Sequence, residues 1–242
     1  MKQALLIMGM ICCFGGVKAQ ENFARVNQFV DLTATVGNSQ GTVAAAYVRN
    51  WKFGKHKRLE AGLGLRWTSY FGTQTDFTTA PARLARTNTT PFLIFFAGQR
   101  TDYHDTLNVQ RPFTNSLNIS INLGYNFNSR WNAGFNIDLI GFTFGRTSSA
   151  ILQSYGTTKT EPTAKPAAFN VLLTGDHDYG SLNSEFFLKY KLKKRWGIKA
   201  VYQFFFIEYK TENITQVAPD GTMVDRFRNK ANNFGLGVSY NF

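Results

Sequence analysis

The sequence predicts an all-β fold: a closed antiparallel, up-and-down transmembrane barrel of about eight strands. Three observations lead to this prediction. Segments of alternating apolar and polar residues recur along the chain, and a period of two gives a strand one apolar and one polar face. Beyond the N-terminal segment, no apolar run approaches the length of about 18 residues that indicates a transmembrane helix. Because only helices and closed barrels satisfy every backbone group in lipid, membrane-spanning strands must close into a barrel.

Eight alternating segments account for the expected strands. They cover residues 29–36, 42–53, 59–71, 117–128, 131–144, 181–192, 196–206 and 232–242. In the fifth segment the parity slips at Leu139 and Ile140, which predicts a bulge or the end of a strand. An even number of strands is usual for bacterial outer-membrane barrels.

The connections between these segments alternate in length. The short ones cover residues 38–41, 54–58, 128–130 and 193–195, and the long ones cover about 72–115, 147–180 and 211–230. With the C-terminus on the periplasmic side, every long connection lies outside the cell, as is the rule for these barrels. The apolar run 91–98 leaves three alternatives open: an extra strand, part of a ninth and tenth strand pair, or a loop folded into the barrel mouth.

The first residues have the features of a secretory signal. Lys2 precedes an uncharged apolar run, and Val17-Lys18-Ala19 places small residues where signal peptidase requires them. We therefore expect a signal peptide over 1–19 and one barrel domain over 20–242. Both cysteines, Cys12 and Cys13, fall in the signal, so the mature chain has no thiol chemistry. A lipoprotein acylated on Cys13 is the alternative.

Charge narrows the class of partner. The net charge of +12 indicates anionic partners, and export argues against nucleic acid. Basic residues at both ends of the barrel would pair with phosphates of outer-membrane lipid and lipopolysaccharide.

Alternation alone does not show which face points outward, and a soluble lipocalin-like barrel would turn its apolar face inward. The polar face, however, carries charges of both signs, which suits an interior network of paired charges. These expected interior charges are Glu60, Arg66, Asp138, Glu185, Lys189 and Lys199. The apolar face would then contact lipid.

The tryptophans provide a second indication of a membrane. Trp51, Trp131 and Trp196 lie beside predicted periplasmic turns, and Trp67 lies toward the opposite end of its strand. Aromatic belts at both membrane interfaces are typical of such barrels.

The segment FGLGVSYNF resembles the C-terminal signal of outer-membrane β-barrel proteins. The matching residues are Leu236, Val238, Tyr240 and Phe242. The resemblance implies that the barrel-assembly machinery recognises this strand during insertion. The mature chain resembles the small "outer membrane protein beta-barrel" families, comparable to the OmpA transmembrane domain or OmpX, and its signal and aromatic-rich strands resemble those of Bacteroidota. This implies a location in the outer membrane and says little about activity.

Two aspartate–histidine clusters in the long connections are the weak candidates for chemistry. They comprise Asp102, His104 and Asp105 in one connection, and Asp176, His177 and Asp178 in another. Such clusters could hold a divalent metal or supply a base with its orienting acid, although turns favour the same residue types. We expect no cofactor, no metal and no catalysis.

The expected function is therefore a structural or interaction role through the extracellular loops, with a partner that the sequence does not identify. Two alternatives remain. A narrow channel for ions or small solutes would need a tenth strand or a gap in the interior charges. An enzyme that modifies lipopolysaccharide or lipid would use His104 or His177.

Overall fold

The computed structural model describes residues 25–85, 104–154, 156–173, 177–218 and 221–242. Within these residues the structure is largely β-strand, and the one helix among them is the short α2 (Ala82–Ala85). The long strands are β1 (Val26–Gly37), β2 (Gln40–Phe53), β3 (Leu59–Gly72), β6 (Phe113–Asn126), β7 (Trp131–Gly145), β11 (Leu182–Lys191), β12 (Trp196–Lys210) and β15 (Arg226–Asn241). The shorter strands are β4 (Gln74–Thr79), β5 (Thr106–Gln110), β8 (Ser148–Ser154), β9 (Thr157–Pro166), β10 (Phe169–Val171), β13 (Gln216–Val217) and β14 (Met223–Val224). Among the described residues, no helix is both long and apolar enough to cross a membrane.

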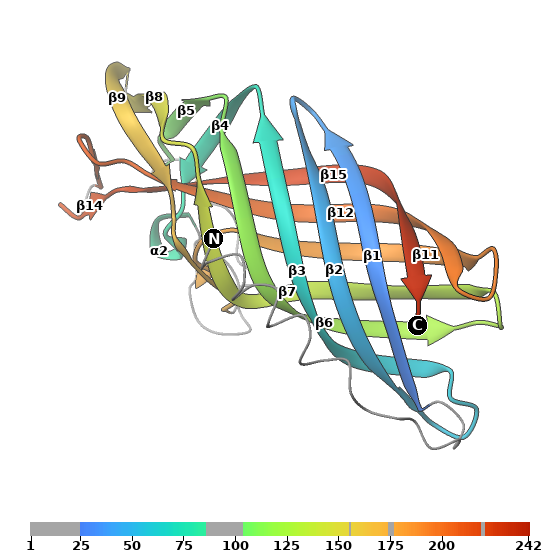
Figure 1. Cartoon of the computed structure of the whole chain (residues 1–242). Helices are drawn as coiled ribbons and strands as arrows, with labels where there is room; N and C mark the ends of the chain where they lie inside the picture. Colours follow the sequence, from blue (N-terminus) through green and yellow to red (C-terminus); the bar gives the residue numbers. More distant parts are fainter. Residues whose placement is uncertain (1–24, 86–103, 155, 174–176, 219–220) are drawn as a thin grey trace, which may run out of the picture.

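The long strands pair in one closed cycle, which we call the main ring (Figure 1). The antiparallel order is β1, β2, β3, β6, β7, β11, β12 and β15, and β15 returns to β1. The closing pair runs from Phe29 opposite Asn241 to Val36 opposite Phe234. The last strand is thus hydrogen-bonded on both edges, because it also pairs with β12.

A second, smaller closed cycle continues one end of the main ring. In this small ring β15 pairs with β4, then β5, β8 and β9 follow, and β9 returns to β12. The far ends of β12 and β15 belong to both rings. Figure 1 shows β4, β5, β8 and β9 beyond the long strands, at the end away from the C-terminus.

The small ring has fewer strands than the main ring because some strand pairs end earlier than others. β3 runs into β4, β5 into β6 and β7 into β8 after interruptions of one or two residues, so these strands contribute to both rings. The β1–β2 hairpin instead ends at a two-residue turn, where Ser39 has a φ of 59°. With β1 and β2 ending there, β4 takes their place beside β15.

The predicted number of strands and the predicted long loops need correction. The sheet has 13 strands, because five short strands join the eight long ones, and β13 and β14 form a separate pair. The expected outer connections 72–115, 147–180 and 211–230 therefore contain strands. These strands escape the periodicity search because most are too short to show a convincing alternation. The run 91–98 and the signal 1–19 lie outside the described residues.

The parity slip in β7 is a bulge rather than a strand end. β7 continues to Gly145, and its pairing with β6 jumps from Asp138 opposite Ser120 to Ile140 opposite Ile119. Leu139 is the extra residue. Beyond the bulge, the neighbour of β7 on its other side changes from β11 to β10.

In the main ring the polar face points inward and the apolar face points outward. Leu63, Leu65, Ile198 and Leu236 are between 47% and 73% exposed, whereas the alternate residues of the same strands are largely buried. The outward apolar residues of β3 run from Leu59 to Phe71. Twelve steps of about 3.3 Å at a typical tilt of about 45° span about 28 Å, close to the apolar band of an outer-membrane barrel.

The polarity reverses in the small ring. On β15 the outward residues change from Phe234 to Asn232 and Lys230, while the inward residues change from Asn233 to Ala231 and Phe227. The small ring thus has a buried apolar core and a polar outside, as in a water-soluble barrel. Its core residues are Tyr70, Phe77, Leu107, Val109, Ala150, Leu152, Ala164, Phe205, Ile207, Tyr209, Phe227 and Ala231.

Candidate functional site

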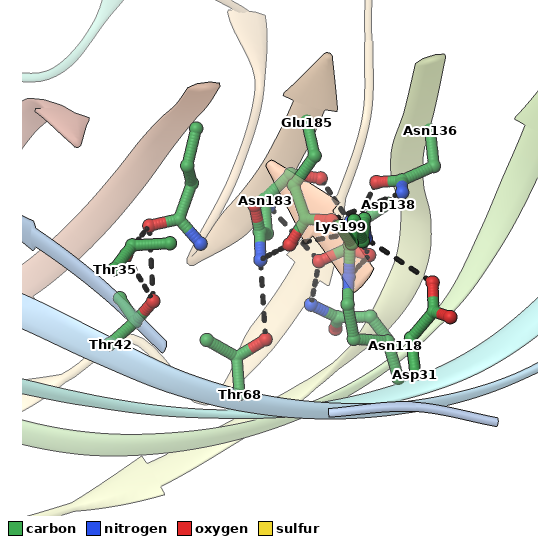
Figure 2. Close-up of polar contacts among 12 residues, drawn as sticks. Asp31, Thr35, Thr42, Thr68, Asn118, Asn136, Asp138, Asn183, Glu185 and Lys199 are labelled. Atoms are coloured by element: carbon green, nitrogen blue, oxygen red, sulfur yellow. Dashed lines mark hydrogen bonds and ion pairs between the residues drawn. The ribbon is translucent and has the colours of Figure 1, made fainter. Parts of the chain in front are cut away.

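The candidate site is the polar network inside the main ring, part of which Figure 2 shows. Arg66 connects several members of this network. Arg66 projects inward from β3 and is 2% exposed. Gly64 precedes it on the same face, where an added Cβ would come within 2.8 Å of Ser120 Oγ. The glycine therefore keeps this part of the narrow interior free of a side chain.

Asp138 is the principal partner of Arg66. Arg66 Nε and Nη2 donate to Asp138 Oδ1 over 2.9 and 2.5 Å. The other oxygen, Oδ2, accepts from Asn118 Nδ2 at 2.8 Å and from the backbone N–H of Asn183 at 3.0 Å. The carboxylate is completely buried, and these four donors replace the water that it loses.

Arg66 also links Asp138 to a second carboxylate. Its Nη1 lies 3.5 Å from Glu185 Oε1 and donates to the side-chain carbonyl of Asn136. Asn136 in turn donates to Glu185 Oε2 at 3.2 Å. One guanidinium therefore connects β3 to β7 and β11 across the interior.

The remaining interior charges continue this chain of alternating signs. Lys199 lies 2.8 Å from Glu185 Oε2 and 3.3 Å from Asp31 Oδ2, and Lys189 lies 2.8 Å from the same Asp31 oxygen. Both lysine ammonium groups lie about 5 Å from the ring centre of Phe187, a favourable cation–π distance. Three carboxylates and three cations thus neutralise one another in the middle of the main ring.

Glu60 forms a separate cluster near the end of the ring that carries the C-terminus. It accepts hydrogen bonds from Asn126 at 2.7 Å, Asn27 at 3.0 Å and Asn50 at 3.3 Å, and Lys52 lies 3.7 Å away. A cavity of about 70 Å³ opens beside this cluster. This volume has room for a few water molecules.

Uncharged polar groups and then aromatic rings fill the interior toward the small ring. Gln203 Oε1 accepts hydrogen bonds from Thr35, Thr42 and Asn233 over 2.7 to 3.1 Å. Beyond this layer the rings of Tyr70 and Phe205 pack with centroids 5.7 Å apart, and those of Phe77 and Tyr209 with centroids 5.3 Å apart. Such aromatic packing excludes water from this end.

The structure places the other predicted residues as follows. Trp51, Trp67, Trp131 and Trp196 point outward and are 40% to 52% exposed. Of the predicted assembly-signal residues, Leu236 and Val238 are 73% and 44% exposed on the outward face of β15, and Tyr240 is partly exposed. Phe242 directly follows β15 and is 70% exposed.

Among the described residues, the two histidine clusters do not form a metal site. Asp102 and Asp176 lie outside those residues. Within the ranges described, no three His, Cys, Asp or Glu side chains lie close enough to hold an ion. Asp178 Oδ1 accepts a hydrogen bond from the backbone of Leu173, and the backbone N–H of Asp105 donates to Thr79 Oγ1.

Sequence reasoning missed three parts of the polar structure. The first is Asp31, which joins both interior lysines. The second is the set of interior amides, Asn118, Asn136 and Asn183, whose shared parity with the charged residues is the signal that could have found them. The third is a pair of anchors in the small ring, Glu161 and Glu208, which the short strands do not reveal.

Comparisons with known proteins add the following. No family model matches the chain, and no curated protein matches it. Among solved structures, Ail of Yersinia pestis is 9% identical, with 90% of this chain and 96% of that chain covered and a TM-score of 0.34. A designed transmembrane β-barrel is 7% identical, with 93% and 100% covered and a TM-score of 0.34. Neisserial surface protein A is 9% identical, with 90% and 96% covered and a TM-score of 0.33. At these scores none of the three bears on the function of this chain.

Proposed function

We propose that this protein is an outer-membrane β-barrel whose eight long strands span the membrane, that it does not conduct, and that it acts through its extracellular end. The membrane location is supported by the outward apolar face of the main ring and by the outward tryptophans near its ends. We orient the barrel so that the short turns and the C-terminus face the periplasm and the small ring lies outside the cell.

The observation that carries the proposal is the apolar core that closes the extracellular end. Residues such as Phe77, Leu152 and Phe227 fill the small ring and have 1% exposure or less. Below them, the paired charges and amides occupy the eight-stranded interior, which is just wide enough for side chains. A channel would need a continuous water-filled path. The apolar core of the small ring and the paired side chains inside the main ring both block such a path.

The small ring also supports a role in interactions. The part of its surface that the structure describes is built largely from paired strands, whose shape costs little conformational entropy on binding. The β13–β14 pair carries Val217 and Met223, whose side chains are 58% and 73% exposed. The interior offers no arrangement of nucleophile, base and orienting acid, because its described charges are engaged with one another.

Planar-bilayer recording tests the sealed interior. We expect no discrete conductance from purified protein whose insertion is verified by its heat-modifiable gel mobility. Stable conductance steps of a single size from inserted protein would contradict the sealed barrel and favour the channel.

Single-cysteine labelling of intact cells tests the orientation, and it is clean because both native cysteines lie in the predicted signal. We expect a membrane-impermeant maleimide to label Met223→Cys and to leave Lys194→Cys unlabelled until the outer membrane is permeabilised. Labelling of Lys194→Cys alone on intact cells would invert the proposed orientation.

A further inference from the structure

Three short turns at the C-terminal end of the main ring form a continuous basic region, which we call the basic rim. The turns comprise residues 52–58, 127–130 and 191–195. Backbone hydrogen bonds tie neighbouring turns together: Asn126 N–H, just before the second turn, donates to Arg58 O, and Lys191 N–H donates to Arg130 O. The basic residues of the rim are Lys52, Lys55, Lys57, Arg58, Arg130, Lys191, Lys193, Lys194 and Arg195.

The rim concentrates the charge of the molecule. Its sixteen residues hold nine of the chain's 27 Lys and Arg residues and none of its 15 Asp and Glu residues. At the opposite end cations and carboxylates are interspersed: Arg226 and Arg228 contact Glu208, and Lys165 lies 2.8 Å from Glu212. Of the rim cations, Lys52 lies 3.7 Å from Glu60, on the neighbouring strand. Inside the main ring, acids and bases also pair. The excess positive charge of the described chain therefore lies mainly at the rim.

The rim is amphipathic as well as basic. Each of its three turns exposes a large apolar side chain among the cations: Phe53 (51%), Phe127 (53%) and Leu192 (58%). Two cations are also tied to outward tyrosines of the apolar band. Arg130 Nη1 donates to the hydroxyl of Tyr190 at 3.3 Å, and Arg195 Nη1 donates to that of Tyr240 at 3.1 Å.

We propose that the basic rim is a binding site for anionic phospholipids of the inner leaflet, which it selects over zwitterionic lipids through their headgroup phosphates. Interleaved cations and apolar side chains match a lipid interface, where phosphates and acyl chains lie next to each other. A soluble polyanion would match the cations and leave Phe53, Phe127 and Leu192 exposed to water. The tyrosine contacts hold Arg130 and Arg195 at the outer edge of the ring, facing the surrounding lipid.

The inference rests on the proposed membrane location, and its test separates the two. The full chain is reconstituted in nanodiscs of mixed phosphatidylcholine and phosphatidylglycerol, and insertion is checked first by heat-modifiable mobility. Failure of the chain to insert would contradict the proposed membrane location itself. Lipids that remain bound after mild detergent extraction are then counted by native mass spectrometry.

We expect the native chain to retain phosphatidylglycerol in preference to phosphatidylcholine. In the variant Lys193→Gln/Lys194→Gln/Arg195→Gln, the ratio of retained phosphatidylglycerol to phosphatidylcholine should fall at least tenfold. Each cation near an anionic surface contributes roughly a fivefold factor to binding. The matched control, Arg111→Gln/Lys159→Gln/Lys165→Gln, removes the same charge from the opposite end and should keep the preference.

Three results would overturn the inference. The native chain could show no preference, the rim variant could retain it, or the control could lose as much as the rim variant, which would indicate net charge rather than a site. A last arm adds soluble polyphosphate to the protein in phosphatidylcholine nanodiscs. Tight polyphosphate binding without any lipid preference would assign the rim to a periplasmic polyanion instead.

Discussion

Arg66 shows how a single residue organises the interior. It contacts Asp138 and approaches Glu185, and it also donates to the backbone carbonyl of Asn183, so one side chain on β3 is joined to both β7 and β11. A buried ion pair is not by itself strong evidence of stability, because desolvation offsets most of the attraction. Removing one partner is different, since it leaves a charge buried without compensation.

The Asp138→Ala variant tests this at the level of one residue. We expect it to lower the free energy of unfolding by about 3–5 kcal/mol, because Arg66 would keep its burial and lose its closest carboxylate. Guanidinium titration in micelles, followed by tryptophan fluorescence, measures the change. The control is Asp76→Ala on β4, where the exposed carboxylate accepts one hydrogen bond from Asn108 and its loss should cost about 1 kcal/mol or less. Equal losses for both variants would refute the central role of Asp138.

At the scale of elements, Glu161 ties β9 to the segment that follows β12. Its Oε2 accepts the backbone N–H groups of Glu212, Asn213 and Ile214 over 2.8 to 3.2 Å, and Oε1 accepts the side chains of Asn213 and Thr163. Burial alone would raise the pKa of this carboxyl. The hydrogen bonds from Asn213, Thr163 and Ile214 outweigh burial and lower the pKa to about 2.

This pKa gives the small-ring end a defined response to acid. The folded pKa lies below the ordinary value of 4.5, so the stabilisation from Glu161 is complete above about pH 4.5 and is lost as the pH falls toward 2. Hydrogen exchange of peptides covering 211–214, corrected for intrinsic rates, should accelerate over this interval. Protection that stays unchanged down to pH 2 would contradict the assignment.

Substitution provides a second test of the same anchor. Glu161→Gln places an N–H₂ group or a neutral oxygen against several donors and should cost about 2 kcal/mol of local protection at neutral pH. Glu212→Gln is the matched control, because that carboxylate is 44% exposed and pairs only with Lys165 among the described residues. Its effect should be within about 0.5 kcal/mol.

At the scale of the whole molecule, closure depends on the last strand. β15 pairs with β12 along its length and with β1 over Phe234–Asn241, and Phe242 N–H donates to Gln28 O. A closed sheet has no free edge, which is what lipid requires of strands. The side chain of Phe242 is 70% exposed, so its contribution to packing is small.

We therefore expect Phe242→Asp to block assembly rather than to loosen a folded barrel. The heat-modifiable form should disappear from the membrane fraction, with degradation in the periplasm, while Phe242→Tyr should assemble at native levels. Refolding both purified variants into detergent is the control, since assembly by the machinery is bypassed there. Native membrane levels of Phe242→Asp would contradict the role that resemblance assigns to this residue.

The interior charges illustrate how far sequence reasoning reaches. Glu60, Arg66 and Glu185 share the parity of glycines, serines and asparagines, which was enough to predict their inward direction. Which carboxylate pairs with which cation was not predictable, because that depends on the register between strands far apart in the chain. Asp31 was missed for this reason: it lies in a weakly patterned strand, and its partners Lys189 and Lys199 come from the other half of the sequence.

Alternation with a period of two is a local property, and it was sufficient to predict an all-β fold, most of the long strands and the outward apolar face. It could not reveal the small ring. The strands β4, β5 and β8 have only five to seven residues, and their apolar side faces inward, so their pattern matches no membrane strand. Their pairing with one another and with the far ends of β12 and β15 is non-local. Only the tertiary structure shows that parts of the predicted loops fold into the small ring with its apolar core, because a core exists only where strands from distant parts of the chain meet.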